Sequence, residues 1–226
     1  MSGIEAAFFA DDIMNFNNLR ITHLDSLKFD WSDKTVLELG CGPGIISKYF
    51  YDKGVDIYPV EGRQDIIDFV KKQNKNSKIM QHNLTDDDWS LIPKCDITIA
   101  YGILYHIQNP LKFIDNIYEK TNNFCVIETV VSLDTNEDGI YNLNEGTTHT
   151  QAIDGIGCRP TRNILWNYMK TKFAYVYMPL TQTRHIEFPS QFNVPECHTA
   201  RFVIIGSKIP LNNELLSSSF VSKYNK

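Results

Sequence analysis

The chain has 226 residues, a length that suits one large domain able to bury about 70% of the surface of its unfolded form. Hydrophobic residues make up 42% and charged residues 22%, so collagen-like, coiled-coil and low-complexity chains are excluded. The 22 Lys and Arg are scattered among 27 Asp and Glu, and the formal net charge of −5 argues against a broad phosphate-binding face.

No stretch approaches 18 consecutive apolar residues, and Met1–Asp12 carries acidic residues without a basic n-region. Neither a membrane span nor a secretory signal is therefore expected. The odd number of cysteines indicates reduced thiols in a cytoplasmic protein rather than a disulfide framework. The five are Cys41, Cys95, Cys125, Cys158 and Cys197.

Strands and helices are predicted to alternate from about Lys34 to Val131. Short apolar runs predict five strands, at Lys34–Leu39, Val55–Val60, Lys78–His82, Asp96–Tyr101 and Phe124–Val131. Helical spacing predicts helices at Ile45–Lys53, at Arg63–Lys72 and after Asn109-Pro110, which is typical of an N-cap followed by Pro at the first helical position. Strands that are apolar on both faces and separated by helices indicate an α/β fold with a parallel sheet covered on both sides.

The final third of the chain has a different pattern. Ser132–Cys158 is polar and without a clear period, which predicts a long cover loop over residues 132–158. Pro160–Thr171 is predicted to be helical with Pro160 near its start. Phe173–Met178 and Arg201–Gly206 are predicted to pair as an antiparallel hairpin. Residues 1–206 then form a single domain, and residues 207–226 form a loosely held tail.

The most informative segment is Val36–Gly44, in which Gly40, Gly42 and Gly44 lie between a predicted strand and a predicted helix. Glycines there allow a tight turn and a close backbone approach to a ligand, and the helix directs free N–H groups at the same place. A dinucleotide fingerprint requires glycine at position 45, which is Ile45, so the spacing favours a smaller nucleoside.

Glu61 ends the second predicted strand, 21 residues after Gly40. A carboxylate at this place in a doubly wound sheet accepts hydrogen bonds from ribose hydroxyls. The alternative is a plain strand–helix turn with a surface acid, but the two features occur together at the expected distance.

The two motifs, Glu38-Leu39-Gly40-Cys41-Gly42-Pro43-Gly44 and Val60-Glu61-Gly62, resemble those of class I S-adenosylmethionine-dependent methyltransferases. The resemblance implies a Rossmann-like seven-stranded sheet of order 3-2-1-4-5-7-6 with strand 7 antiparallel, and S-adenosylmethionine as cofactor. The cofactor-binding residues that it implies are Glu38, Gly40, Cys41, Gly42, Gly44, Glu61, Gly62, Asn83, Leu84 and Tyr101. Asn83 and Leu84 then lie beside the adenine and Tyr101 at the methionine end, although aspartate is more usual than asparagine at the adenine position.

A second resemblance lies in Tyr101–Pro110, where Leu104-Tyr105-His106 precedes a proline. The segment is similar to small-molecule O-methyltransferases and to enzymes that carboxymethylate a wobble uridine of tRNA with a carboxylated cofactor. Two further segments resemble methyltransferases encoded with glycan-assembly genes: Asn18-x-Arg20-x-x-His23-Leu24 and Arg184-His185-x-x-Phe188-Pro189.

Three residues are candidates for catalysis. His106 follows the fourth strand and suits a general base, or it packs under the next helix without chemistry. Tyr105 either stacks on a substrate or fills the core. Glu128 stands in an apolar strand, where a carboxylate is costly unless it is paired or binds a ligand.

Three further residues are candidates for binding the acceptor: Arg159, Arg162 and His185. The two arginines flank a predicted helix start and suit a carboxylate or phosphate, or they pair with nearby acids. Residues 1–30 are predicted to form an amphipathic helical lid that carries Arg20 and His23, or a helix that merely packs.

The spacing of His149, His185, His198, Cys158 and Cys197 matches no ligand template, so no metal is expected. His82 is interpreted as a strand-edge residue without chemistry.

The sequence therefore predicts a cytoplasmic methyltransferase that modifies an oxygen of a small polar acceptor, with a sugar or sugar nucleotide as one candidate. Neither a membrane nor a nucleic acid is the expected partner, and the oligomeric state is open. An RNA-modifying enzyme and a non-catalytic cofactor-binding protein are the alternatives.

Overall fold

The computed structural model describes residues 3–133, 139–146, 148–192 and 199–224. Within these ranges eight strands form one sheet in the spatial order β10-β8-β9-β5-β4-β1-β2-β3. The strands are β1 (Thr35–Leu39), β2 (Asp56–Glu61), β3 (Met80–Gln81), β4 (Cys95–Tyr101), β5 (Thr121–Val131), β8 (Tyr175–Pro179), β9 (Ala200–Ser207) and β10 (Leu216–Ser217).

The first five strands are parallel, β9 runs antiparallel to β5, and β8 pairs antiparallel with β9. With β8 and β9 as the predicted sixth and seventh strands, the order 3-2-1-4-5-7-6 is confirmed. The structure adds β10 beyond β8, and it shortens the predicted third strand to two residues.

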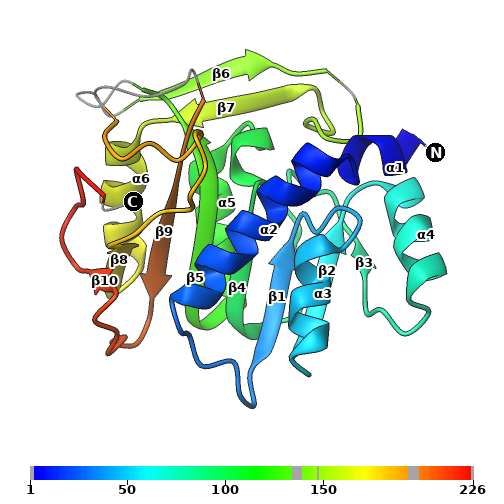
Figure 1. The fold of residues 1–226 in the computed structure, drawn as a ribbon, viewed down its shortest axis with the longest axis horizontal. Helices are drawn as coiled ribbons and strands as arrows, with labels where there is room; N and C mark the ends of the chain where they lie inside the picture. Colours follow the sequence, from blue (N-terminus) through cyan, green and yellow to red (C-terminus); the bar gives the residue numbers. More distant parts are fainter. Residues whose placement is uncertain (1–2, 134–138, 147, 193–198, 225–226) are drawn as a thin grey trace.

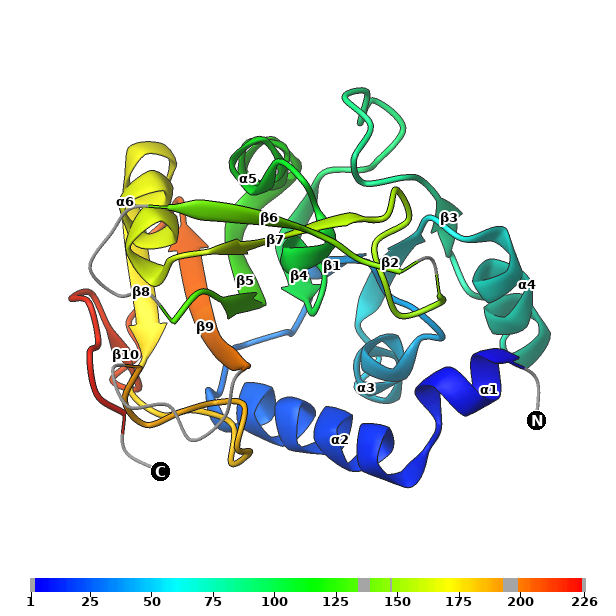
Figure 2. The same ribbon diagram turned by 90° about the horizontal axis from the view of Figure 1, so that it is seen from above.

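Helices cover both faces of the sheet. One face is covered by α2 (Asp11–Ser26) and α3 (Ile45–Asp52), and the other by α5 (Pro110–Lys120) and α6 (Arg162–Lys172) (Figure 2). Because successive strand residues point to opposite faces, Val203 packs in the core on the α2 side and Ile204 in the core on the α5 side. The predicted N-cap Asn109 is confirmed, since its side chain accepts a hydrogen bond from the Lys112 N–H. The helix α4 (Gln64–Gln73) packs beside β2 and β3.

The N-terminal segment forms two helices where the sequence indicated one. The helix α1 (Gly3–Phe8) ends at Phe8, and α2 begins at Asp11. Figure 1 shows α1 near the edge at which β1 ends, whereas α2 runs along one face of the sheet.

The prediction of an irregular loop over residues 132–158 is wrong. This region contains β6 (Ile140–Asn144) and most of β7 (Ile156–Pro160), which pair antiparallel as a separate two-stranded sheet. Figure 1 shows this cover hairpin across the edge of the main sheet at which β1 ends. The strand β6 carries mostly exposed or half-exposed residues, so no hydrophobic run marked it in the sequence.

The predicted helix start at Pro160 is also corrected. Pro160 ends β7, and α6 begins at Arg162 after the N-cap Thr161, whose side chain accepts a hydrogen bond from the Ile164 N–H. A proline is compatible with a strand that has one unpaired edge, so the same residue fits either element.

The segment after Ser207 is not loosely held. The strand β10 pairs with β8, and the Tyr224 side chain is only 2% exposed. The Arg162 guanidinium lies over the Tyr224 ring and also over the rings of Phe192, Phe202 and Phe220. Isolated aromatic residues anchor this C-terminal arm, which has a polar composition overall.

Candidate active site

The glycine loop lies between β1 and α3 in the predicted position. Gly40, Gly42 and Gly44 have φ values of 69°, 52° and 85°, a region that side chains other than glycine rarely adopt. The backbone N–H groups of Gly40 and Cys41 both donate to the Val60 carbonyl, at 2.9 and 3.0 Å, which ties the loop to the end of β2.

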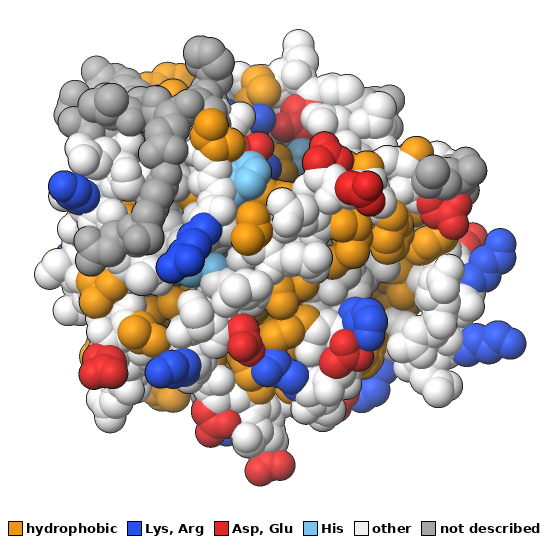
Figure 3. Space-filling view, in the orientation of Figure 1, with side chains coloured by type: hydrophobic (Ala, Val, Ile, Leu, Met, Phe, Trp, Pro, Cys, Tyr) orange, Lys and Arg blue, Asp and Glu red, His pale blue; other side chains and the backbone are white. Residues whose placement is uncertain are grey.

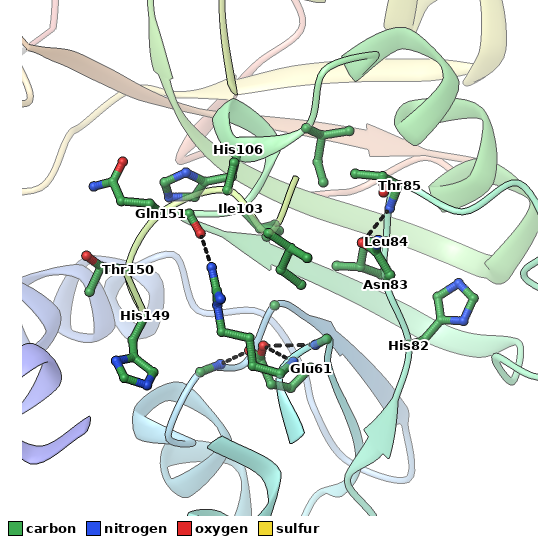
Figure 4. A pocket seen from close by; sticks show the side chains of 18 of the residues that line it. Glu61, His82, Asn83, Leu84, Thr85, Ile103, His106, His149, Thr150 and Gln151 are labelled. Atoms are coloured by element: carbon green, nitrogen blue, oxygen red, sulfur yellow. Dashed lines mark hydrogen bonds between the residues drawn. The ribbon is translucent and has the colours of Figure 1, made fainter. Parts of the chain in front are cut away.

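Glu61 lies beside this loop and holds it. Its Oε2 accepts from the Gly42 N–H at 3.0 Å, and its Oε1 accepts from the Gly62 and Arg63 N–H groups at 2.8 and 2.9 Å. Burial raises the pKa of Glu61, and the three N–H donors oppose that shift without cancelling it. Figure 4 shows these hydrogen bonds at the floor of a cavity.

This cavity, which we call the cofactor cavity, collects residues from six segments, one of which contributes only Phe8 of α1. Its lining includes Gly40, Gly42, Glu61, Gly62, Asn83, Leu84, Gly102, Ile103, His106 and residues 149–153. Figure 4 places Asn83, Leu84 and Thr85 on one side, Ile103 near the centre, and His106 and Gln151 on the other side. The fold therefore brings the predicted ribose and adenine residues together with the catalytic candidate His106.

Four predicted cofactor residues lie behind this lining. Glu38 is buried and accepts a hydrogen bond from the Ser47 hydroxyl, and burial raises its pKa to about 8. Cys41 packs against α4, Gly44 is the N-cap residue of α3, and Tyr101 is buried beneath the Arg20 guanidinium. Direct contact of these four with a cofactor stays a prediction.

His106 belongs to a short 3₁₀ helix, η1 (Leu104–His106), that follows β4. Its Nδ1 lies 2.5 Å from Glu145 Oε2. Burial lowers the pKa of His106 and outweighs the opposing effect of the Glu145 carboxylate, which favours the neutral ring. A neutral imidazole in the wall of the cofactor cavity has the protonation state that a general base needs.

Glu128 is completely buried in β5 and pairs with two arginines. Arg20 of α2 donates to Oε2, and Arg201 of β9 donates to Oε1 at 3.2 Å. Burial by itself raises the pKa of Glu128, but the two guanidinium charges outweigh burial and lower it. The arginines therefore keep Glu128 ionised, and each of its two oxygens already accepts a hydrogen bond from one of them. Both facts disfavour Glu128 as a general base.

Tyr105 is linked to this ion-pair network. Its hydroxyl accepts from Arg201 Nη2 at 3.3 Å, and its ring lies 5.2 Å from the Arg159 guanidinium carbon and 4.9 Å from that of Arg201. Two guanidinium groups therefore make cation–π contacts with the Tyr105 ring.

The three predicted acceptor residues do not form one site. Arg162 is only 3% exposed, lies among four aromatic rings and does not line the cofactor cavity, contrary to its prediction as an acceptor ligand. Arg159 lies near His106, because its Nη1 donates to the Tyr105 carbonyl and to Glu145 Oε1, both at 3.4 Å. The His185 ring packs on the Phe16 ring at 4.8 Å. An acceptor-binding role for Arg159 or His185 stays a prediction.

Several residues of the site carry no pattern that identifies them in the sequence. Arg63 Nη2 donates to the carbonyls of Thr148 and Gln151 at 3.1 and 3.0 Å, and thereby holds the connection between β6 and β7 against the cavity. Two side-chain contacts at 2.6 Å hold the same connection, His149 to Asp65 and Thr85 to Asp154. Charged and polar residues in a non-periodic segment give no signal of such pairing.

No group of three or more His, Cys, Asp or Glu in the described part of the chain is arranged to hold a metal ion. Cys197 and His198, which are among the residues considered as metal ligands in the sequence, lie outside the described residues. None of the described helices has the length and apolar character needed to cross a membrane.

A glycine loop after the first strand and an acid at the end of the second, in a sheet of this order, define a class I S-adenosylmethionine-dependent methyltransferase fold. The family model described as "Methyltransferase domain" matches residues 19–197, and the chain belongs to that family. This confirms the resemblance noted in the sequence, with S-adenosylmethionine as the cofactor of the class.

Individual relatives are distant. The chain is 23% identical over 122 residues to a ubiquinone biosynthesis O-methyltransferase of Rickettsia typhi, a match over 50% of each protein. It thus spans about half the length of the curated relatives it matches. Among solved structures, the N-terminal domain of EvdMO1 with SAH bound has a TM-score of 0.64 and 13% identity, covering 84% of this chain and 79% of that one. An S-adenosylmethionine-dependent methyltransferase of Archaeoglobus fulgidus has a TM-score of 0.62 and 14% identity. That match covers 90% of this chain and 97% of the other.

Proposed function

We propose that the chain transfers a methyl group from S-adenosylmethionine to an oxygen of a small polar acceptor, with His106 as the general base. The observation that carries this proposal is the position of His106 in the wall of the cavity that also contains the glycine loop and Glu61, where burial lowers the pKa of the histidine. The O-methyltransferase activity in the name of the Rickettsia relative is consistent with this chemistry.

The residues around the cavity fit the cofactor. Glu61 contributes a carboxylate to the cavity wall, the group that ribose hydroxyls require, and the left-handed glycines leave the loop backbone open to a ligand. When bound, S-adenosylmethionine supplies the methyl group: the acceptor oxygen bonds to the methyl carbon while the carbon–sulfur bond breaks and its electron pair stays on sulfur. His106 takes the proton that the acceptor hydroxyl loses.

A sugar or sugar nucleotide is the acceptor class we place first. The segments 18–24 and 184–189 resemble methyltransferases of glycan assembly, and the helix turn just before the first segment packs against the second. Phe16, next to the first segment, packs on His185 and Phe188 of the second. RNA is not favoured as the acceptor. On the face of the molecule that carries α2, Figure 3 shows Lys and Arg side chains dispersed among Asp and Glu.

The experiment is a transfer assay with S-adenosylmethionine labelled in its methyl group. Purified chain is incubated with sugar nucleotides, with a small-molecule cell extract, or with total tRNA. Label in a small polar molecule supports the proposal. Label in tRNA establishes the RNA-modifying alternative, and tight S-adenosylhomocysteine binding without transfer to any pool establishes a non-catalytic protein.

A further inference from the structure

A carboxylate from the cover hairpin contacts the ring of His106. Glu145 directly follows β6, and its side chain is only 4% exposed. Its Oε2 contacts Nδ1 of His106, which leaves Nε2 as the ring nitrogen that a general base would use. The two residues are 39 positions apart, and they meet because the cover hairpin crosses the sheet edge where η1 lies.

Glu145 is itself held in place by several contacts. The Ala152 N–H donates to Oε2 at 2.9 Å, and Arg159 Nη1 donates to Oε1 at 3.4 Å. The Glu145 N–H donates to the Gly155 carbonyl at 2.8 Å. Gly157 leaves room for the carboxylate, since a Cβ there would lie 2.5 Å from Oε1. The carboxylate position is thus set by the cover hairpin and not by His106 alone.

An ionised carboxylate only accepts hydrogen bonds, so a hydrogen bond to it requires a proton on Nδ1 of His106. In a neutral imidazole the other nitrogen, Nε2, is then the acceptor. A general base needs this tautomer when its Nε2 faces the substrate. The protein also stabilises the imidazolium that forms after proton transfer, because the carboxylate remains next to it.

We propose that Glu145 is a positioning residue, which holds His106 in the tautomer with hydrogen on Nδ1 so that Nε2 accepts the acceptor's proton. This inference rests on the proposed function only for the use of that nitrogen, and the tautomer itself can be observed without any acceptor. The charged groups that face His106 are Glu145 after β6, Arg159 on β7 and Arg201 on β9. Of these, only Glu145 raises the pKa of the ring.

The test uses protein with ¹⁵N-labelled histidine rings, whose nitrogen chemical shifts distinguish the two neutral tautomers and the imidazolium. Signals of His106 are identified by their loss in His106→Gln. In the wild type at pH 7.5 we expect hydrogen on Nδ1. In Glu145→Ala that preference is lost. Glu145→Gln retains an acceptor oxygen, so it keeps the tautomer but lowers the pKa of His106, because the negative charge is gone.

Asp154→Asn is the matched control, because Asp154 lies in the same connection between β6 and β7 but contacts Thr85 and not His106. It should leave the tautomer and the pKa of His106 unchanged. Hydrogen on Nε2 in the wild type, or an unchanged tautomer in Glu145→Ala, overturns the inference whether or not the chain methylates anything.

The activity measurement is made separately, once an acceptor is known. We expect Glu145→Ala to lower kcat by about 10- to 100-fold, the usual effect of removing a partner that orients a functional histidine, with KM for S-adenosylmethionine changed less than about threefold. Glu145→Gln should recover part of kcat. A loss confined to KM would show that Glu145 only holds the cover hairpin, and would overturn the positioning role.

Discussion

Gly42 combines two properties at one residue, a left-handed backbone and a position in the wall of the cofactor cavity. Gly54 shares only the first, because its φ is 72° and it does not line the cofactor cavity. We expect Gly42→Ala and Gly54→Ala to destabilise the fold by a similar amount, on the order of 1 kcal/mol.

Only Gly42→Ala should weaken S-adenosylhomocysteine binding, which isothermal titration calorimetry would measure. Equal affinity in the two variants would show that the loop does not approach the cofactor.

His106 is the second residue whose role can be isolated. We expect His106→Ala to lose roughly 10²–10⁴ in kcat while S-adenosylhomocysteine affinity stays within a few-fold, because a positioned base acts on the acceptor proton. Since burial lowers the pKa of His106, the acid limb of the wild-type pH–rate profile should have its midpoint below the ordinary value of 6.5.

That acid limb should disappear in His106→Ala. If His106→Ala has the kcat of the wild type, His106 only packs in the structure and is not the general base.

At the scale of the elements, Glu128 joins three of them, because its partners are Arg20 on α2 and Arg201 on β9. Removing its charge leaves two buried guanidinium groups without their counter-ion. We expect Glu128→Gln to lower the free energy of unfolding at pH 7 by about 3–5 kcal/mol, measured by urea denaturation.

The pH dependence has a defined sign. The native pKa of Glu128 lies below its ordinary value of 4.5, so the ion pairs stabilise the fold above that pH and lose this contribution as the pH falls through the native pKa. Glu128→Gln should lack this part of the acid dependence. Glu187→Gln is the control, because Glu187 pairs with the same Arg201 but is 30% exposed, and it should cost about 1 kcal/mol or less.

The C-terminal arm is a second element-scale feature, anchored by Tyr224 beneath the Arg162 guanidinium. We expect Tyr224→Ala to destabilise the domain by about 3–5 kcal/mol, as for other buried aromatic side chains. Lys223→Ala, at the exposed neighbouring position, should stay within about 0.5 kcal/mol of the wild type. Equal stability of the two variants in urea would mean that the arm contributes nothing to the fold.

For the whole molecule, the cofactor cavity joins elements from the first half of the sheet to the cover hairpin, so ligand binding should stabilise the entire fold. S-adenosylhomocysteine at 100 times its Kd should add about 2.7 kcal/mol. For a chain of this length that raises Tm by roughly 5–10 °C in differential scanning fluorimetry. The rise should shrink in Glu61→Ala, and its absence in the wild type at millimolar ligand would contradict cofactor binding.

The glycine loop and Glu61 could be found in the sequence because their signals are local. The glycine loop and Glu61 stand at the ends of two neighbouring strands, and parallel strands place their carboxyl ends at one edge. Hydrophobic periodicity predicted the strands themselves, with ends displaced by only a few residues, whereas their order and the antiparallel strand were implied by the family resemblance.

Only the tertiary structure decided which charged residues meet around His106 and Glu128. Glu128 pairs with Arg20 and Arg201, which are 108 and 73 residues away in the sequence. Glu145 contacts His106, which is 39 residues away. Hydrophobic periodicity says which face of an element is buried but not which charged residues meet, because such pairs depend on long-range packing. The cover hairpin and the C-terminal arm could not be predicted from hydrophobic periodicity either. Each is a polar segment that is held by a few polar contacts or by single aromatic anchors.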